Sequence, residues 1–334
     1  MSKFKLLLAF ASLLMVTTAC SNDNNEPVIT TDESNVTFSV NLNDIDSRVI
    51  SDGTTVDQLI FAVFDTNGNE IAVLRQNDVP VSNCHATVTS RVQLGRGFTF
   101  VFWAQKKKVG SLNDNGYYTT TDLKDIVVNY EGYANDENRD AFTAVYSIAK
   151  VTEDFTQNVT LKRPFAQLNY VCDMTEWTNL KNSLYKLVGT DVTIEAGAYT
   201  HYNALTGEAS QPTTTPITFA LSDYYRHHRP GSYEFCGFAT TPNGESYDNL
   251  FDGDKFWLSM NYILATPEVT NLTNTAMNIY CWASNEGVTP VQVAPISEVP
   301  IQRNHRTVIT VSNLTQKVTT TITIDPGFDA EYNY

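Results

Sequence analysis

The side chains with the clearest potential for chemistry are four consecutive residues, Arg226-His227-His228-Arg229. Two imidazoles between two guanidinium groups could bind a metal ion or an anion, but a metal site needs a third ligand and none is apparent. We therefore interpret this segment as a polar loop. The chain also lacks the nucleophile-elbow, zinc-protease and phosphate-binding glycine motifs. The sequence predicts a protein that is not an enzyme and that holds no cofactor and no metal.

The first twenty residues have the parts of a secretory signal. A basic start precedes an apolar core, Leu6–Val16, which is too short to span a bilayer stably. Small residues before Cys20 resemble the lipobox of bacterial lipoproteins, although Thr17 stands where that pattern prefers Leu. The resemblance implies that Cys20 carries the lipid; the alternative is an ordinary signal peptide in which this Cys has no role. Residues 21–34 are polar and follow as a flexible tether.

Four further cysteines leave two interpretations open: Cys84, Cys172, Cys236 and Cys281. An even number in an exported protein permits two disulfides, in any of three pairings. Widely spaced Cys in strand-like segments can equally be plain buried thiols. None of the four has the close spacing of a metal or redox site.

One segment near each end of the chain alternates apolar and polar side chains. Val36–Leu42 does so strictly, which is the period of a strand with one face buried, and Arg48 follows after a polar connection. Near the far end, a segment of the same length places Val318, Ile322 and Ile324 on one face. Two such segments could fill the same kind of groove. This suggests strand exchange between subunits, with Arg48 as the place where the first strand is cut away.

The alternative for the second segment is that it closes its own domain, since sandwiches commonly end on such a strand.

Strands separated by turns, with almost no helix, indicate an all-β fold. We predict two tandem β-sandwich domains, residues 35–160 and 161–334. Asn67-Gly68 predicts a hairpin between strands at Gln58–Phe64 and Glu70–Leu74. Further strands are predicted at residues 87–94, 98–104, 126–130, 141–148, 165–171, 192–194, 217–221, 233–238, 256–264, 276–283, 299–301 and 307–311.

One helix is predicted in the second domain, from Asp173 to Val188. Asp173 can cap it, with Glu176 at the capping-box distance, and Gly189 would stop it. An apolar stripe at helical spacing supports the prediction: Trp177, Leu180, Leu184 and Leu187.

The formal net charge of −15 argues against nucleic acid and anionic membrane surfaces as partners. Four tryptophans could stack on sugars: Trp103, Trp177, Trp257 and Trp282. Each lies within an apolar strand or on the predicted helix stripe, so packing in a core is the favoured interpretation.

Several stretches together resemble the fimbrillin family, the type V pilins of anaerobic diderm bacteria and their surface lipoproteins. They are the start ending at Cys20, Ser47–Val49, Leu59–Gly68, Leu161–Leu168, Tyr202–Gly207 and Val299–Thr307. The resemblance implies transthyretin-like sandwiches and a palmitate-bearing lipoprotein on the outer membrane, or in a fimbria once processed. It also implies removal of the first strand by a trypsin-like protease. Arg48 matches the cleavage position by context, so Val49 would become the new N-terminus.

In this family a strand from a neighbouring subunit refills the groove, so the implied partners are other pilus subunits, of the same or another kind. The resemblance also allows an adhesion ligand on host or bacterial cells. Shaft and tip subunits are cut, whereas anchor subunits keep the lipid and the strand, and the sequence leaves this role open. The competing function is a glycan-binding surface lipoprotein, which would need exposed aromatic side chains.

Overall fold

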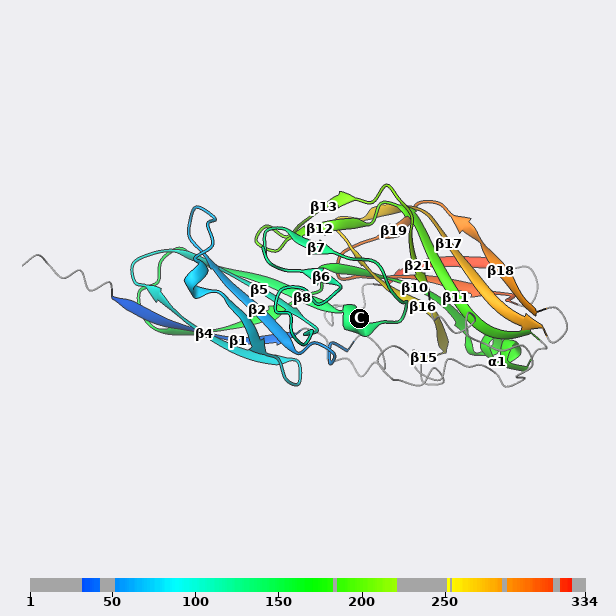
Figure 1. Cartoon of the computed structure of the whole chain (residues 1–334), viewed down its shortest axis with the longest axis horizontal. Helices are drawn as coiled ribbons and strands as arrows, with labels where there is room; N and C mark the ends of the chain where they lie inside the picture. Colours follow the sequence, from blue (N-terminus) through cyan, green and yellow to red (C-terminus); the bar gives the residue numbers. More distant parts are fainter. Residues whose placement is uncertain are drawn as a thin grey trace, which may run out of the picture. The chain divides into compact units, whose positions relative to one another are not determined.

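The computed structural model describes residues 32–42, 52–182, 185–220, 251–252, 254–283, 287–314 and 319–325. Within these ranges the chain is built from strands, with one α-helix, α1 (Met174–Asn182), and two 3-10 turns, η1 (Ala72–Leu74) and η2 (Glu137–Arg139) (Figure 1). The predicted all-β fold with one short helix is confirmed. The predicted domain boundary near residue 161 stays a prediction.

The first sheet has three strands, in the order β4 (His85–Gln93), β1 (Glu33–Leu42) and β9 (Phe155–Leu161). The second sheet has four, in the order β3 (Gln76–Pro80), β2 (Gln58–Phe64), β5 (Phe98–Gln105) and β8 (Ala141–Ile148). The inner faces of these two sheets enclose one apolar core. The predicted strand at residues 141–148 coincides with β8.

Strands β2 and β5 are buried on both faces. All seven residues of β2 are buried, and alternate residues such as Ile60 and Phe61 belong to two different cores. A strand covered on both sides needs apolar side chains at every position, so it does not alternate. This explains the continuous apolar runs in Gln58–Phe64 and Phe98–Ala104.

The described residues form three further sheets. A four-stranded sheet has the order β13 (Glu208–Pro212), β12 (Tyr199–Asn203), β7 (Ile126–Val128) and β6 (Tyr118–Thr119). A five-stranded sheet has the order β15 (Phe251–Asp252), β16 (Lys255–Leu264), β10 (Phe165–Asp173), β20 (Arg306–Ser312) and β21 (Thr319–Asp325). The last sheet has the order β14 (Ile217–Ala220), β11 (Tyr185–Ala196), β17 (Thr270–Ala283) and β18 (Gly287–Ile296), and β19 (Val299–Ile301) pairs with β17.

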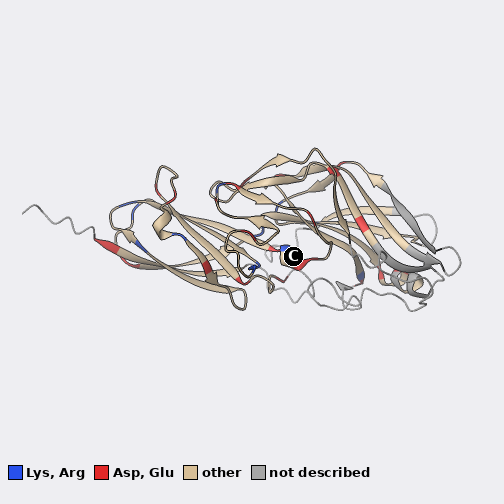
Figure 2. Cartoon of the chain, in the orientation of Figure 1, with Lys and Arg blue, Asp and Glu red and all other residues tan. Residues whose placement is uncertain are grey.

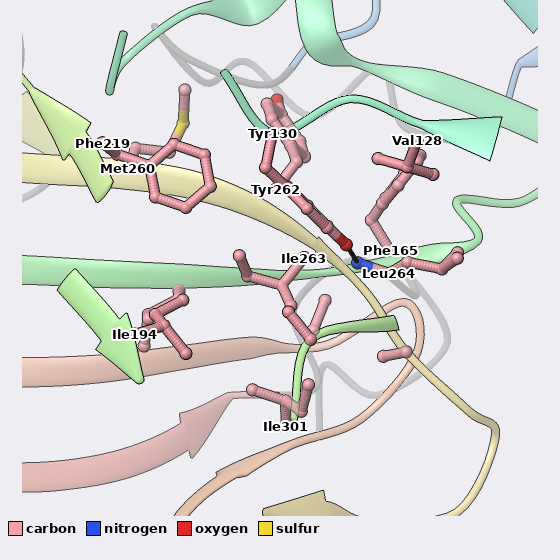
Figure 3. Packing of buried hydrophobic residues seen from close by; sticks show 14 of the residues in the cluster. Val128, Tyr130, Phe165, Ile194, Phe219, Met260, Tyr262, Ile263, Leu264 and Ile301 are labelled. Carbon is pink, nitrogen blue, oxygen red and sulfur yellow. Dashed lines mark hydrogen bonds between the residues drawn. The ribbon is translucent and has the colours of Figure 1, made fainter. Parts of the chain in front are cut away.

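A second, larger core joins these sheets to the outer face of the β2–β5 pair. Figure 3 shows part of it, with Ile263 of β16 on the side of Ile194 of β11 and Ile301 of β19, and Tyr262 on the side of Tyr130. The Tyr130 hydroxyl accepts a hydrogen bond of 3.0 Å from the backbone N–H of Leu264, so a buried polar group in this core is satisfied.

The helix is shorter than the sequence predicts. Asp173 caps it as expected, because its carboxylate accepts a 2.7 Å hydrogen bond from the backbone N–H of Glu176. The helix ends at Asn182, however, and Tyr185 already begins β11, which pairs with β17 along its length. The predicted helix to Val188 was therefore wrong, because ladder pairing with β17 outweighed the helical spacing of the leucines.

The hairpin prediction was right about the turn and wrong about the second strand. Gly68 has a φ of 77°, and the Asp65 carboxylate accepts hydrogen bonds from the backbone N–H groups of Asn67 and Asn69. Residues 72–74 then form the turn η1, and the strand that pairs with β2 is β3.

Within the described residues, no helix is long and apolar enough to cross a membrane. The described Lys and Arg side chains are spread over several elements rather than gathered in one stripe (Figure 2).

Candidate assembly groove

Strand β1 is the central strand of its sheet although it lies near the start of the chain. It runs antiparallel to β4, from Glu33 opposite Gln93 to Asn41 opposite His85. It runs parallel to β9, from Val36 opposite Phe155 to Leu42 opposite Leu161. Both of its main-chain edges are therefore paired. We call the space that β1 occupies between β4 and β9 the assembly groove.

One face of β1 is inserted into the first core. Val36, Phe38 and Val40 are at most 1% exposed and Leu42 is 5% exposed, while the residues between them face outward. This confirms the strand predicted from strict alternation. Burial of each such side chain contributes roughly 1.5–3 kcal/mol, so the strand is held by its side chains as well as by its backbone.

Phe38 occupies the most aromatic part of the groove. Its ring centroid lies 4.8 Å from that of Phe100 and 5.1 Å from that of Phe102. Three further rings lie around it: Tyr146 at 5.6 Å, Phe61 at 5.9 Å and Phe155 at 6.1 Å. These five rings define what we call the Phe38 pocket. They come from β2, β5, β8 and β9, so the pocket belongs to both sheets of the sandwich.

The start of β1 is held by polar contacts. The Asp154 carboxylate accepts hydrogen bonds of 2.8 Å from the Ser34 hydroxyl and from the backbone N–H of Asn35. These bonds favour the ionised form and hold the pKa of Asp154 below its usual value. Beside them, Arg91 of β4 forms an exposed ion pair of 2.9 Å with Glu33.

The far end of β1 lies near a buried ion pair. The backbone N–H of Leu42 donates to the Cys84 carbonyl at 2.9 Å. Beyond Leu161, Arg163 donates to both oxygens of Asp140, at 2.7 and 2.6 Å, with both side chains 1% exposed. The Arg163 guanidinium also lies 4.4 Å from the centroid of the Phe142 ring. Burial raises the pKa of Asp140, and the neighbouring Arg163 opposes that rise.

Strand β21, the segment expected to be exchanged, is held quite differently. Among the described strands it lies at the end of its sheet and pairs with β20 alone, with Ile322 opposite Ile309. Thr320, Thr321 and Thr323 are exposed, Ile322 is 37% exposed and Ile324 is half-buried. The strand is therefore held largely by its backbone hydrogen bonds along one edge.

The predicted site residues fall partly outside the described residues. Cys20, Arg48, Val49 and Val318 lie outside them, as do Cys236 and the His227-His228 pair. Ile322 and Ile324 lie on β21, and the structure places β1 and β21 in different sheets. Their roles in exchange stay predictions.

Sequence reasoning missed three features of the groove: the pairing of β1 with β9, the Asp154 contacts and the Arg163–Asp140 pair. All three join residues far apart in the chain, which periodicity does not reveal. The sequence signal available for the ion pair was a single charged residue, Arg163, between the apolar Leu161 and Phe165.

Two of the cysteines are buried free thiols, Cys84 and Cys172. Two disulfides would need all four cysteines after Cys20. Because Cys84 and Cys172 are free, none of the three possible pairings is formed. Burial raises the pKa of both thiols, so neither has the character of a reactive cysteine. Trp103 and Trp257 are also buried, as expected, so neither can stack on a sugar. No group of three metal-ligating side chains occurs within the described residues.

Comparison with solved structures finds fimbrial proteins. The tip fimbrial protein Mfa3 from Porphyromonas gingivalis, with a C-terminal truncation, is 14% identical, covers 88% of this chain and 99% of its own, and has a TM-score of 0.46. A fimbrial assembly protein from Parabacteroides distasonis is 12% identical, covers 88% of this chain and 100% of its own, and has a TM-score of 0.42. The chain is thus similar in fold to these two solved structures.

No curated protein matches the chain. A family model described as a family of unknown function, DUF6562, matches residues 28–334. The match covers most of the sequence, and the chain therefore belongs to the DUF6562 family.

Proposed function

We propose that this chain is a structural subunit of a type V pilus, exported as an outer-membrane lipoprotein on Cys20 and assembled by strand exchange after cleavage at Arg48. One observation carries the proposal: a strand near the start of the chain is the central strand of its sheet. Removing β1 would open a groove along the whole sheet, with unpaired edges on β4 and β9 and an apolar floor. Such a groove is a template for a strand from another chain.

Cleavage at Arg48 would make β1 separable. On its C-terminal side β1 joins the rest of its sandwich through residues 43–51, which contain Arg48. A cut at Arg48 leaves β1 held by non-covalent contacts alone. A competing strand that offers the same main-chain pairing can then replace it.

The strand that this chain gives to a neighbour is β21 in our proposal. Its described side chains are mostly exposed, and among the described strands it is paired along one edge, so detaching it uncovers little apolar surface. Entry into a groove like that of β1 would pair both of its edges and bury Ile322 and Ile324. The strand gains contacts by the transfer, which gives the exchange a direction.

The test of cleavage uses the surface-exposed protein from the producing bacterium. In wild type, N-terminal sequencing should read from Val49, and gels run without boiling should show a ladder of oligomers. Arg48→Ala should leave the N-terminus at Cys20 and abolish the ladder.

Arg96→Ala is the matched control, because Arg96 is an exposed arginine in a turn between β4 and β5 and should behave as wild type. If Arg48→Ala gives the same N-terminus and the same ladder as wild type, the proposal is wrong.

Ile322→Asp should block assembly while leaving the subunit folded. Because Ile322 is partly exposed at a sheet edge, the substitution should cost roughly 1 kcal/mol or less and lower the Tm by at most about 4 °C. In a groove the same carboxylate would be buried without a partner, so the ladder should disappear.

Thr323→Asp on the exposed face of β21 is the control and should leave the ladder intact. A large fall in Tm for Ile322→Asp would instead indicate that β21 closes its own domain.

A further inference from the structure

The Phe38 pocket sets a requirement on any strand that enters the assembly groove. Phe38 is fully buried, and five aromatic rings lie with their centroids within 6.1 Å of its own. Protein cores are close-packed, so these rings cannot collapse fully onto a smaller side chain. An incoming strand without a ring at this position would leave a cavity at the centre of the groove.

The chain's own Thr315–Ile324 is a poor match for this pocket. With Val318 in the place of Val36, Ile322 and Ile324 replace Val40 and Leu42 well, but Thr320 takes the place of Phe38. If the segment is shifted by one residue relative to β1, its threonines face the core. Shifting by two brings Ile322 to the pocket and Pro326 to the place of Leu42. No register or direction supplies an aromatic ring, because Val318–Ile324 contains none.

A charge contact at the start of the groove favours the chain's own strand, but its effect is smaller than that of the missing ring. In the first register Lys317 takes the place of Asn35 beside Asp154. The carboxylate of Asp154 is exposed to solvent, and exposed ion pairs contribute little. The loss of an aromatic ring from the Phe38 pocket is the larger effect. The fit to this pocket therefore determines which strand the groove binds more tightly.

We propose that the Phe38 pocket is a specificity pocket for assembly. It takes a strand with an aromatic side chain at the position of Phe38, supplied by a different pilus subunit, and it discriminates against Val318–Ile324 of a second copy of this chain. Assembly at this groove is therefore heterotypic. This inference rests on the proposed function, because the groove opens only if β1 is removed.

The test measures binding of labelled peptides to the full chain nicked at Arg48 by limited trypsin digestion. Fluorescence anisotropy gives the affinity, and mass spectrometry detects the released fragment that contains β1. The peptide Glu33–Leu42 should bind. The peptide Thr315–Ile324 should bind roughly a hundred-fold more weakly, the effect of a missing aromatic side chain in a packed core.

Thr320→Phe in the second peptide should recover most of that affinity. Thr323→Phe, which places the ring on the exposed face, is the control and should recover none. Binding of the unmodified Thr315–Ile324 peptide within about threefold of Glu33–Leu42 would overturn the inference, and so would equal recovery by the two Phe variants.

Two other outcomes are separable. The peptide Phe328–Tyr334 contains three aromatic residues, Phe328, Tyr332 and Tyr334, and tight binding by it would make a second copy the partner and overturn heterotypic assembly. If Glu33–Leu42 itself does not bind and β1 is not released, the proposed function fails and the inference falls with it.

Discussion

Phe38→Ala should destabilise the uncut protein more than any other single truncation on β1. Removing the ring leaves a cavity among five aromatic side chains, and such truncations cost about 3–5 kcal/mol. At about 2–4 °C per kcal/mol, the Tm should fall by roughly 6–20 °C. Differential scanning calorimetry of the purified chain measures the change.

The control for Phe38→Ala lies one residue away on the opposite face. Thr37 points outward and its hydroxyl shares an exposed hydrogen bond of 3.0 Å with that of Thr89. Thr37→Val should change the free energy of unfolding by no more than about 0.5 kcal/mol. If the two variants melt alike, β1 does not support the core that the groove proposal assigns to it.

Asp140→Ala should be the most disruptive single change of a charged residue near the groove. It leaves the Arg163 guanidinium, which is 1% exposed, without its carboxylate. Breaking a buried ion pair in this way costs about 3–5 kcal/mol, so urea unfolding should shift to a clearly lower midpoint.

Two comparisons separate the lost pair from a general loss of packing. In the exposed pair, Arg91→Ala should cost less than about 1 kcal/mol. The double variant Asp140→Leu with Arg163→Met removes both charges and should recover much of the lost stability, because apolar replacements of a buried pair are often neutral. A double variant that unfolds as early as Asp140→Ala would show that the pair's charge is not what matters.

A strand was predictable from the sequence wherever the pattern of apolar and polar residues within one segment determined its position. Val36–Leu42 alternates because one face is buried, and residues 299–301 and 141–148 coincide with observed strands. The predicted strand at Glu70–Leu74 was wrong because an Asn-Gly turn marks a reversal without saying where the next ladder begins. Glu70 makes a single antiparallel bridge to Phe64, and the ladder with β2 resumes only after η1, in the polar segment Gln76–Pro80, which an edge position tolerates.

The groove itself was only half predictable. Alternation shows that Val36–Leu42 has a buried face, but it cannot show that β1 is central, because that depends on a parallel partner far along the chain. The same limit applies to α1: Leu184 and Leu187 fit a helical stripe, and pairing with the distant β17 and β14 makes residues 185–196 a strand. The spacing of apolar residues within a segment shows which face is buried. Which strands pair with that segment depends on residues far away in the chain.

The parallel pairing of β1 with β9 has a consequence for the order of events in the life of the protein. Val36 cannot pair with Phe155 until the chain has been made as far as β9. The pairing of β1 is therefore completed only after most of its sandwich has been synthesised. A protease that cut at Arg48 before then would leave the sandwich to fold without its central strand and with open edges prone to aggregation. If the chain is cut at Arg48 as we propose, the cut must follow folding, and resistance of the 43–51 connection until then would decide the yield of usable subunits.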